Sequence, residues 1–162
     1  AKVPLDGRTE LLIVLKTDTQ LEEAVRYVGA DRLIFATDGT WDNCVAEELS
    51  IAASGGADVD ITSQSSKINL AISGGADAEI SGRCITLNVA ASGGADADLD
   101  ASLEELIAND VTVAASGGAD VTVHATESLV VEASGGADVA YIGNPTTKDI
   151  NRSGGADVYV ND

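Results

Sequence analysis

The chain has 162 residues, of which 44% are hydrophobic and 3% aromatic, and its 9 basic and 27 acidic residues give a net charge of −18. This length and apolar content suit one folded domain and exclude a disordered acidic tail. The charge disfavours nucleic acid and anionic lipid as partners, and no run approaches the roughly 20 apolar residues of a membrane span.

Position 1 is alanine, and the chain contains no methionine. We therefore expect that an export signal was removed ahead of Ala1, although trimming of a longer chain would give the same beginning. An exported protein of this kind would be periplasmic, attached to the cell surface or extracellular.

Residues 1–48 are interpreted as a less regular N-terminal cap, because the end of a repeat array must be shielded. Four elements are expected in it: strands over residues 11–15 and 32–36, a short helix over 18–28, and a turn at Asp38-Gly39. We expect Trp41, beside that turn, to pack over the end of the core.

Residues 49–162 contain six copies of the pentapeptide Ser-Gly-Gly-Ala-Asp, at intervals of 19, 19, 24, 18 and 19 residues. Apolar and polar residues alternate on both sides of each copy, which is the pattern of strands with one buried face. A unit of this length is too short for a propeller blade and lacks the pattern of a leucine-rich repeat. The sequence therefore predicts an all-β fold, a right-handed, single-stranded parallel β-helix with about 19 residues in each coil, forming one domain over residues 1–162.

Each Gly-Gly pair is expected at a corner, where glycine allows a sharp turn. Val59 and Ile61 should then point inward, and Asp58 and Asp60 outward. Coils stacked about 4.8 Å apart would make six of them a rod of roughly 29 Å. The longest interval carries extra residues within 101–110, which we expect to form one helical turn that bulges from a corner.

The spaced Ser-Gly-Gly-Ala-Asp steps, with the late segment Tyr141-Ile-Gly-Asn-Pro145 before the last of them, resemble the head GIN domain family of auto-transporter adhesins. The resemblance covers residues 49–162 well and residues 1–48 loosely. It implies a right-handed β-helix on an exported or surface-attached protein without enzymatic activity. The chain departs from the family pattern in its nearly invariant pentapeptides.

Stacking would bring the last residue of each pentapeptide into one column of six carboxylates: Asp58, Asp77, Asp96, Asp120, Asp138 and Asp157. Like charges about 5 Å apart repel by about 1 kcal/mol even in water, so something must offset the repulsion. We favour hydrogen bonds from corner N–H groups or from the neighbouring serines. The alternative is a ladder of Ca²⁺ or another hard cation between coils, but the ligand set is short. No cofactor or metal site is therefore assigned.

The serines that begin the pentapeptides should form a second column, which we interpret as a stack of hydroxyl groups: Ser54, Ser73, Ser92, Ser116, Ser134 and Ser153. A triad of Ser116, His124 and Asp120 can be imagined, but any repeat protein with one histidine would supply it. No catalytic residue is assigned, and we expect His124 at a solvent-facing strand or corner position.

Cys44 and Cys84 lie 40 residues apart, close to two coil periods. In register, their Cα atoms would be about 9–10 Å apart, which is beyond the reach of a disulfide. We therefore predict two free, buried thiols. The aromatic residues are too few to suggest a platform for sugars: Tyr27, Phe35, Trp41, Tyr141 and Tyr159.

Three functions are compatible with these features. The first is a non-enzymatic, exported or surface-bound adhesin-like module whose flat faces bind a protein, glycan or other surface. The second is a structural protein whose coils assemble end to end, or face to face, into filaments. The third, which we disfavour, is a carbohydrate-active β-helix enzyme, since the tight coils leave no cleft.

Overall fold

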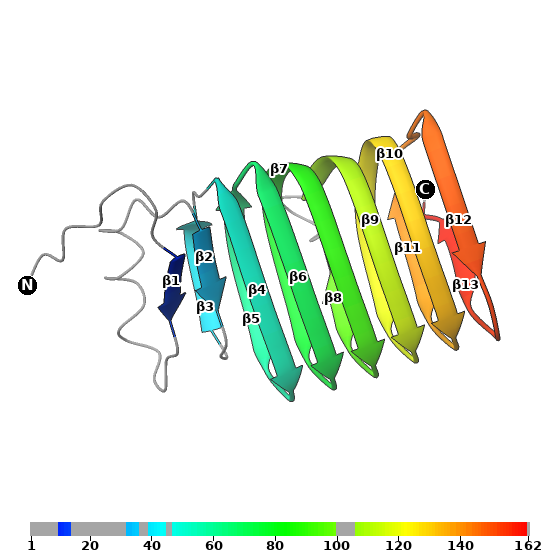
Figure 1. Ribbon diagram of the computed structural model, residues 1–162, viewed down its shortest axis with the longest axis horizontal. Helices are drawn as coiled ribbons and strands as arrows, with labels where there is room; N and C mark the ends of the chain where they lie inside the picture. Colours follow the sequence, from blue (N-terminus) through cyan, green and yellow to red (C-terminus); the bar gives the residue numbers. More distant parts are fainter. Residues whose placement is uncertain (1–9, 14–31, 36–38, 45–46, 100–105, 162) are drawn as a thin grey trace, which may run out of the picture.

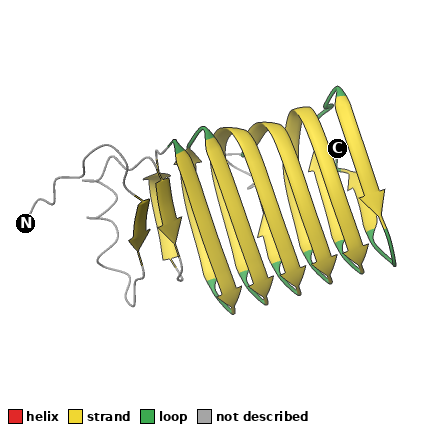
Figure 2. Cartoon of the chain, viewed as in Figure 1, coloured by secondary structure: helices red, strands yellow, loops and turns green. Residues whose placement is uncertain are grey.

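In the computed structural model, the described residues are 10–13, 32–35, 39–44, 47–99 and 106–161, and for the strands before residue 45 the description covers the backbone. The fold is a right-handed parallel β-solenoid of about six turns, and the strands wind around a long axis from the N-terminal to the C-terminal end (Figure 1). No helix occurs in this part of the chain, and short loops join its strands (Figure 2). The predicted fold class is confirmed.

The solenoid is a flattened tube with two walls. One wall, called the front wall, contains β1 (Glu10–Ile13), β2 (Arg32–Phe35), β4 (Glu48–Gly55), β6 (Lys67–Gly74), the second half of β7 (Asp77–Gly93), β9 (Ile107–Gly117), the second half of β10 (Asp120–Gly135) and β12 (Thr147–Arg152). The back wall contains β3 (Gly39–Cys44), β5 (Asp58–Gln64), the first halves of β7 and β10, β8 (Asp96–Asp98), β11 (Asp138–Ile142) and β13 (Asp157–Val160).

The register of the ladders follows the spacing of the pentapeptides. In the front wall, Ser54 is paired with Ser73, Ser73 with Ser92, and the ladder continues through Ser116 to Ser134. The extra residues of the 24-residue interval lie between β8 and β9. The strands before and after them keep the register in which equal positions of the repeat are paired. Equal positions of the repeat therefore lie in columns along the axis, as the spacing predicts.

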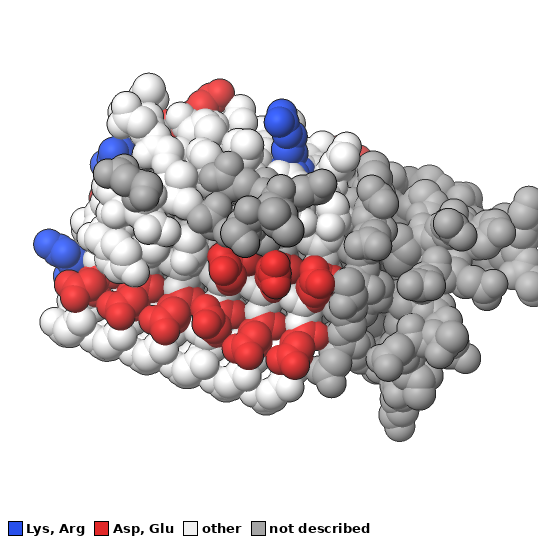
Figure 3. All heavy atoms as spheres, turned by 180° about the vertical axis from the view of Figure 1, so that it is seen from behind, with Lys and Arg blue, Asp and Glu red and all other residues white. Residues whose placement is uncertain are grey.

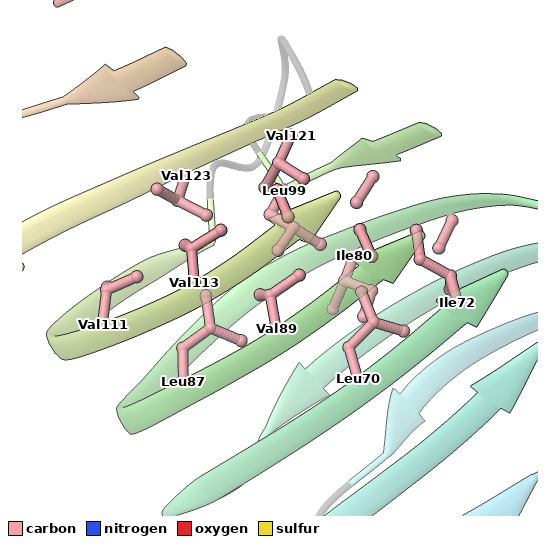
Figure 4. Packing of buried hydrophobic residues seen from close by; sticks show 14 of the residues in the cluster. Leu70, Ile72, Ile80, Leu87, Val89, Leu99, Val111, Val113, Val121 and Val123 are labelled. Atoms are coloured by element: carbon pink, nitrogen blue, oxygen red, sulfur yellow. The ribbon is translucent and has the colours of Figure 1, made fainter. Parts of the chain in front are cut away.

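The core is a single stack of apolar side chains between the two walls. Leu87, Val89, Val111 and Val113 of the front wall point toward side chains of the back wall such as Ile80 (Figure 4). All five side chains are buried. Burial of apolar surface stabilises by about 25 cal/mol per Å², and no coil could bury its inner face without its neighbours.

The inward and outward directions that were expected for the side chains after the corner are confirmed. Val59 and Ile61 are buried, whereas Asp58 and Asp60 are exposed. The first glycine of each pentapeptide turns the chain with a positive φ, which is +82° at Gly93. This conformation is costly for any residue with a Cβ atom, which explains why glycine begins every corner.

The structure describes only the last part of the segment in which a helical turn was expected, residues 106–110. Residues 107–110 belong to strand β9 and pair with β7 and β10, while residues 101–105 lie outside the described residues. Leu106 is fully buried, and its side chain is part of the hydrophobic core. At Ile107, which the expected helical turn included, the structure has a strand instead.

The N-terminal strands continue the ladders of the coils. Strands are present at 10–13 and 32–35, as expected, and β2 pairs with β4 while β3 pairs with β5. Gly39 was expected in a turn, but it begins β3. The expected helix over 18–28 and Asp38 lie outside the described residues, as does the side chain of Trp41.

Cys84 is a free, buried cysteine, as predicted, and its burial raises the pKa of the thiol to about 12. The backbone register places Cys44 beside Ser63, and Ser63 beside Gly82. Cys84 is thus two coils away from Cys44 and two residues further along the strand, beyond the reach of a disulfide. The side chain of Cys44 lies outside the described residues.

Candidate functional site

The back wall carries two rows of carboxylates that run along the solenoid, together called the acidic ribbon here. The first row consists of the last residues of the pentapeptides: Asp58, Asp77, Asp96, Asp120, Asp138 and Asp157. The second row lies two residues further along the strands: Asp60, Glu79 and Asp98. Figure 3 shows both rows on the same face of the molecule.

The ribbon follows from the alternation of side chains in the strand that leaves each corner. In β5 the exposed Asp58 and Asp60 alternate with the buried Val59 and Ile61. Adjacent strands in a sheet are about 4.8 Å apart, so each carboxylate has a neighbour of the same charge in the next coil. The sequence predicted the first row, but it did not predict that the second row would lie beside it.

The corner N–H groups are engaged by the backbone. At the third corner, the N–H of Gly94 donates to the carbonyl of Gly74 at 2.7 Å, and the N–H of Asp96 donates to that of Ala76 at 3.0 Å. The same two bonds recur at the later corners. The N–H groups of the second glycine and of the aspartate therefore extend the ladder between coils, while the hydrogen bonds expected from the other corner N–H groups or from the serines stay a prediction.

The cost of stacking these charges is visible at Asp96, in the middle of the first row. Its pKa is raised, first by desolvation and then by the negative charges of Asp120, Asp77 and Asp98. The neighbours in the two adjacent coils and in the second row therefore act together on one carboxyl group. Ionisation of Asp96 at neutral pH therefore lowers the stability of the fold.

We expect Asp96→Asn to raise the midpoint of urea unfolding at pH 7. A carboxyl whose folded pKa lies above its unfolded pKa binds more protons in the folded state, so its ionisation destabilises the fold as the pH rises. The gain should shrink as the pH falls through the folded pKa of Asp96, because the wild-type group is then protonated as well. Urea titrations at a series of pH values would measure it.

Asp110→Asn is the matched control, since Asp110 is exposed on the front wall, outside the ribbon. It removes the same charge without relieving the ribbon. A stabilisation by Asp96→Asn that is equal at all pH values, or equal to that of Asp110→Asn, would contradict the electrostatic interpretation.

The stacking of carboxylates also raised the alternative of a cation ladder. Within residues 47–99 and 106–161, no group of three or more His, Cys, Asp or Glu side chains has an arrangement that could hold a metal ion. We therefore assign no metal to the ribbon.

The serine column is present, but it does not build a nucleophilic site. Ser116 and Ser134 are half-buried at the corner edge of the front wall. Asp120 and His124 lie on the same strand, β10, four residues apart, which corresponds to about 13 Å. The three members of the imagined triad are therefore not assembled around one point. His124 lies in a strand, as expected, but it is half-buried, whereas a solvent-facing position was expected.

The front wall carries a ladder of hydrogen-bonded side chains that the sequence analysis missed. The amide of Asn88 donates to the amide oxygen of Asn69 at 2.8 Å, and the amide of Asn69 donates to Glu48 at 2.7 Å. Lys67 forms an ion pair with the same carboxylate at 3.3 Å. The identical positions of the two asparagines in their repeats were the signal that could have revealed the ladder.

A shallow, solvent-open hollow of about 400 Å³ lies where the front wall nears its C-terminal end. Three alanines and six polar residues line it: Ala114, Ala115, Ala133, Ser116, Glu132, Ser134, Asn151, Arg152 and Ser153. Among the residues that the structure describes, no helix is long and apolar enough to cross a lipid bilayer.

These features define the class of the protein, a parallel β-solenoid whose two walls display repeating rows of polar and charged side chains. The family described as "Putative auto-transporter adhesin, head GIN domain" matches residues 12–145. The chain belongs to this family. The match begins at residue 12, within the segment where a loose resemblance was expected, and it ends at residue 145, before the last pentapeptide.

The fold is similar to a crystal structure of a "putative adhesin" from Bacteroides fragilis NCTC 9343, with a TM-score of 0.69 and 24% sequence identity. The likeness covers 82% of this chain and 61% of the Bacteroides fragilis chain, so the chain spans less than two thirds of the length of that protein. At this identity the likeness shows the fold. A search of curated protein sequences finds no match.

Proposed function

We propose that this protein is an exported, non-enzymatic, adhesin-like module that binds a protein or glycan surface through its walls. The observation that carries the proposal is the membership of the adhesin family over residues 12–145, on a solenoid whose faces repeat from coil to coil. A periodic, rigid face suits a target with many similar groups, because several weak contacts then form together.

The charge of the back wall favours partners with cationic groups. The acidic ribbon presents nine carboxylates in two rows, which attract basic side chains or amino sugars and repel phosphate backbones. The front wall offers a different surface of amides, hydroxyls and alanines. Each wall can therefore be tested separately for its part in binding.

The test is to screen the purified protein against a glycan array and a panel of surface proteins, and to repeat each positive result with two variants. The ribbon variant combines Asp60→Asn, Glu79→Gln and Asp98→Asn. The wall variant combines Ala71→Arg and Ala90→Arg, at exposed positions of the front wall. We expect one variant to lose binding by about tenfold or more and the other to bind normally. No ligand of any class, or unchanged binding by both variants, would overturn the proposal.

The alternative of end-to-end filaments is disfavoured by the C-terminal coil. Lys148 and Arg152 are paired with the buried Leu129 and Ala133 of the preceding coil, so these two columns change from apolar to charged at β12. Inward-pointing charges at a strand edge oppose the addition of another apolar coil.

A further inference from the structure

The asparagines of the chain differ in the residues that follow them. Two of them, Asn144 and Asn151, have serine or threonine two positions later. The residue between is Pro145 in the first case and Arg152 in the second. The pattern Asn-x-Ser/Thr, with any residue except proline in the middle, marks an asparagine that can accept an N-linked glycan. In this sequence, Asn151 is the asparagine that satisfies the pattern.

The register of the front wall turns Asn151 outward. Asn151 in β12 is paired with Glu132 in β10, which is paired with Ala114 in β9, and all three side chains are exposed. The same column continues through Ala90 and Ala71, which are also exposed. The alternation of the strand sets this direction, whatever lies beyond β12. A large group attached to Asn151 would therefore extend into solvent without entering the core.

The three residues of the motif are presented in extended backbone. Asn151 and Arg152 belong to β12, and Ser153 follows with its N–H donating to the carbonyl of Ala133 at 2.9 Å. Alternate residues of extended chain share one face at a spacing of about 6.6 Å, so the amide and the hydroxyl of the motif lie on the same side. All three side chains are exposed. Both groups that define the motif are thus on an accessible surface.

The amide group of Asn151 is held weakly. Its nitrogen donates to the carboxylate of Asp149 at 3.3 Å, and both side chains are exposed. A hydrogen bond between exposed groups exchanges with bonds to water at small cost. Asn69 and Asn88, in contrast, donate within the partly buried ladder of the front wall at 2.7 and 2.8 Å. A new bond at the amide nitrogen of Asn151 would therefore cost the fold little.

The hollow of the front wall lies beside this amide. Asn151 lines it, together with the hydroxyl groups of Ser116 and Ser134 and the carboxylate of Glu132, and its volume is about 400 Å³. Hydroxyl and carboxylate oxygens form hydrogen bonds with the hydroxyl groups of a sugar. The hollow therefore offers both room and polar partners to the first sugar of a glycan on Asn151.

We propose that Asn151 is the acceptor of an N-linked glycan. The donor is an oligosaccharide joined through a diphosphate to a polyprenyl lipid, and an oligosaccharyltransferase transfers it. A bond forms between Nδ2 of Asn151 and the anomeric carbon of the first sugar, while the bond from that carbon to the diphosphate oxygen breaks. The lipid diphosphate leaves with the electron pair, and Nδ2 releases one proton to solvent.

This inference rests on the export in the proposed function, since the transfer takes place on the side of the membrane to which the chain is exported. It does not depend on adhesion. The glycan would stand on the outer face of the front wall, where Glu132 and Ala114 precede Asn151 in the column. The back wall and its acidic ribbon would stay uncovered.

The test is to direct the protein, with an export signal added, into the periplasm of bacterial cells that carry an oligosaccharyltransferase. Its donor is an undecaprenyl-diphosphate-linked oligosaccharide that begins with N-acetylglucosamine. Intact mass shows whether a glycan is attached, and fragmentation of peptides by electron transfer locates it. We expect one glycan, at Asn151. Asn151→Gln and Ser153→Ala should each abolish it, whereas Ser153→Thr should keep it.

The segment Asn144-Pro145-Thr146 supplies a matched control in the same chain. Asn144 and Thr146 are exposed, and we expect no glycan on the wild-type Asn144, because proline interrupts the motif. Pro145→Ala, combined with Asn151→Gln, completes a motif at Asn144 and should restore one glycan. A thermal melt of each variant shows that it is folded.

The proposal is overturned if Asn151 carries no glycan in cells whose transferase modifies a second, established acceptor protein. A glycan at another position of the wild type, or one that persists in Ser153→Ala, would also overturn it. An unmodified protein that still binds a surface would remove the glycan and leave the proposed adhesion intact. A modified protein that binds nothing would have the opposite meaning.

Discussion

Gly93→Ala is expected to lower the free energy of unfolding by about 2–4 kcal/mol, whereas Gly94→Ala should change it by less than about 1 kcal/mol. The two glycines are adjacent in the same pentapeptide, so composition gives no reason to distinguish them. The difference comes from the backbone. Gly93 has a φ of +82°, and a Cβ atom there would lie 2.9 Å from the carbonyl oxygen of Gly74 in the preceding coil.

Gly94 has no such restriction. A Cβ atom built on it would lie 3.6 Å from the same oxygen, which is an ordinary contact. Alanine there would also restrict the unfolded chain, and this effect favours the folded state. Urea unfolding followed by circular dichroism measures both variants against the wild type. Equal losses at the two positions would contradict the corner geometry.

The second large effect is expected at Val113, which is fully buried in β9. Val113→Lys should lower the free energy of unfolding by about 3–5 kcal/mol, because an ammonium group without a partner would enter the apolar core. The side chain has neighbours from the same column on both sides, Val89 in β7 and Val131 in β10. It cannot reach solvent by a small movement of the strand.

Ala114→Lys is the control for this substitution. Ala114 is the next residue in β9 and is exposed on the front wall, so a lysine there should change stability by no more than about 0.5 kcal/mol. Chemical unfolding of the two variants tests the alternation directly. A chain that tolerates lysine equally at both positions would not have the inward and outward faces described above.

The fold was predictable from the sequence because one short motif fixes the register. A slip by one residue would turn Val59 and Ile61 outward and Asp58 and Asp60 inward, so the alternation allows one phase. The six glycine pairs then set the corners at the same place in every coil. Local pattern and long-range pairing agree, and this agreement makes a solenoid readable from its sequence.

The errors lie where the repeat is interrupted. In the segment after β8, a helical spacing of apolar residues competes with strand pairing, and residues 107–110 join the ladder of β9. The bend within β7 was also not predicted. Gly82 has a φ of +114°, and a Cβ atom on it would overlap the carbonyl of Ser63. This glycine is not part of the pentapeptide, so no repeated signal marked it.

The site was predictable in part. The first row of the acidic ribbon follows from the pentapeptides alone, whereas the second row depends on acids that occur in only three coils, at Asp60, Glu79 and Asp98. The change from apolar to charged residues at β12 could not be predicted. Lys148 and Arg152 look like ordinary surface residues until the ladder aligns them with Leu129 and Ala133.

The measurement that tests the central claim most directly is a pair of distances between spin labels on one outward column of the front wall. Labels at Ala52 and Glu132 are four coils apart, and labels at Ala52 and Asn151 are five coils apart. The background carries Cys44→Ser and Cys84→Ala, so that the labels are attached only at the chosen positions. Pulsed electron paramagnetic resonance should then give label-to-label distances that match backbone separations of about 19 Å and 24 Å, each with a narrow distribution. Broad distributions, or two distances that do not differ by about one strand spacing, would contradict the stacking of equal positions along one axis.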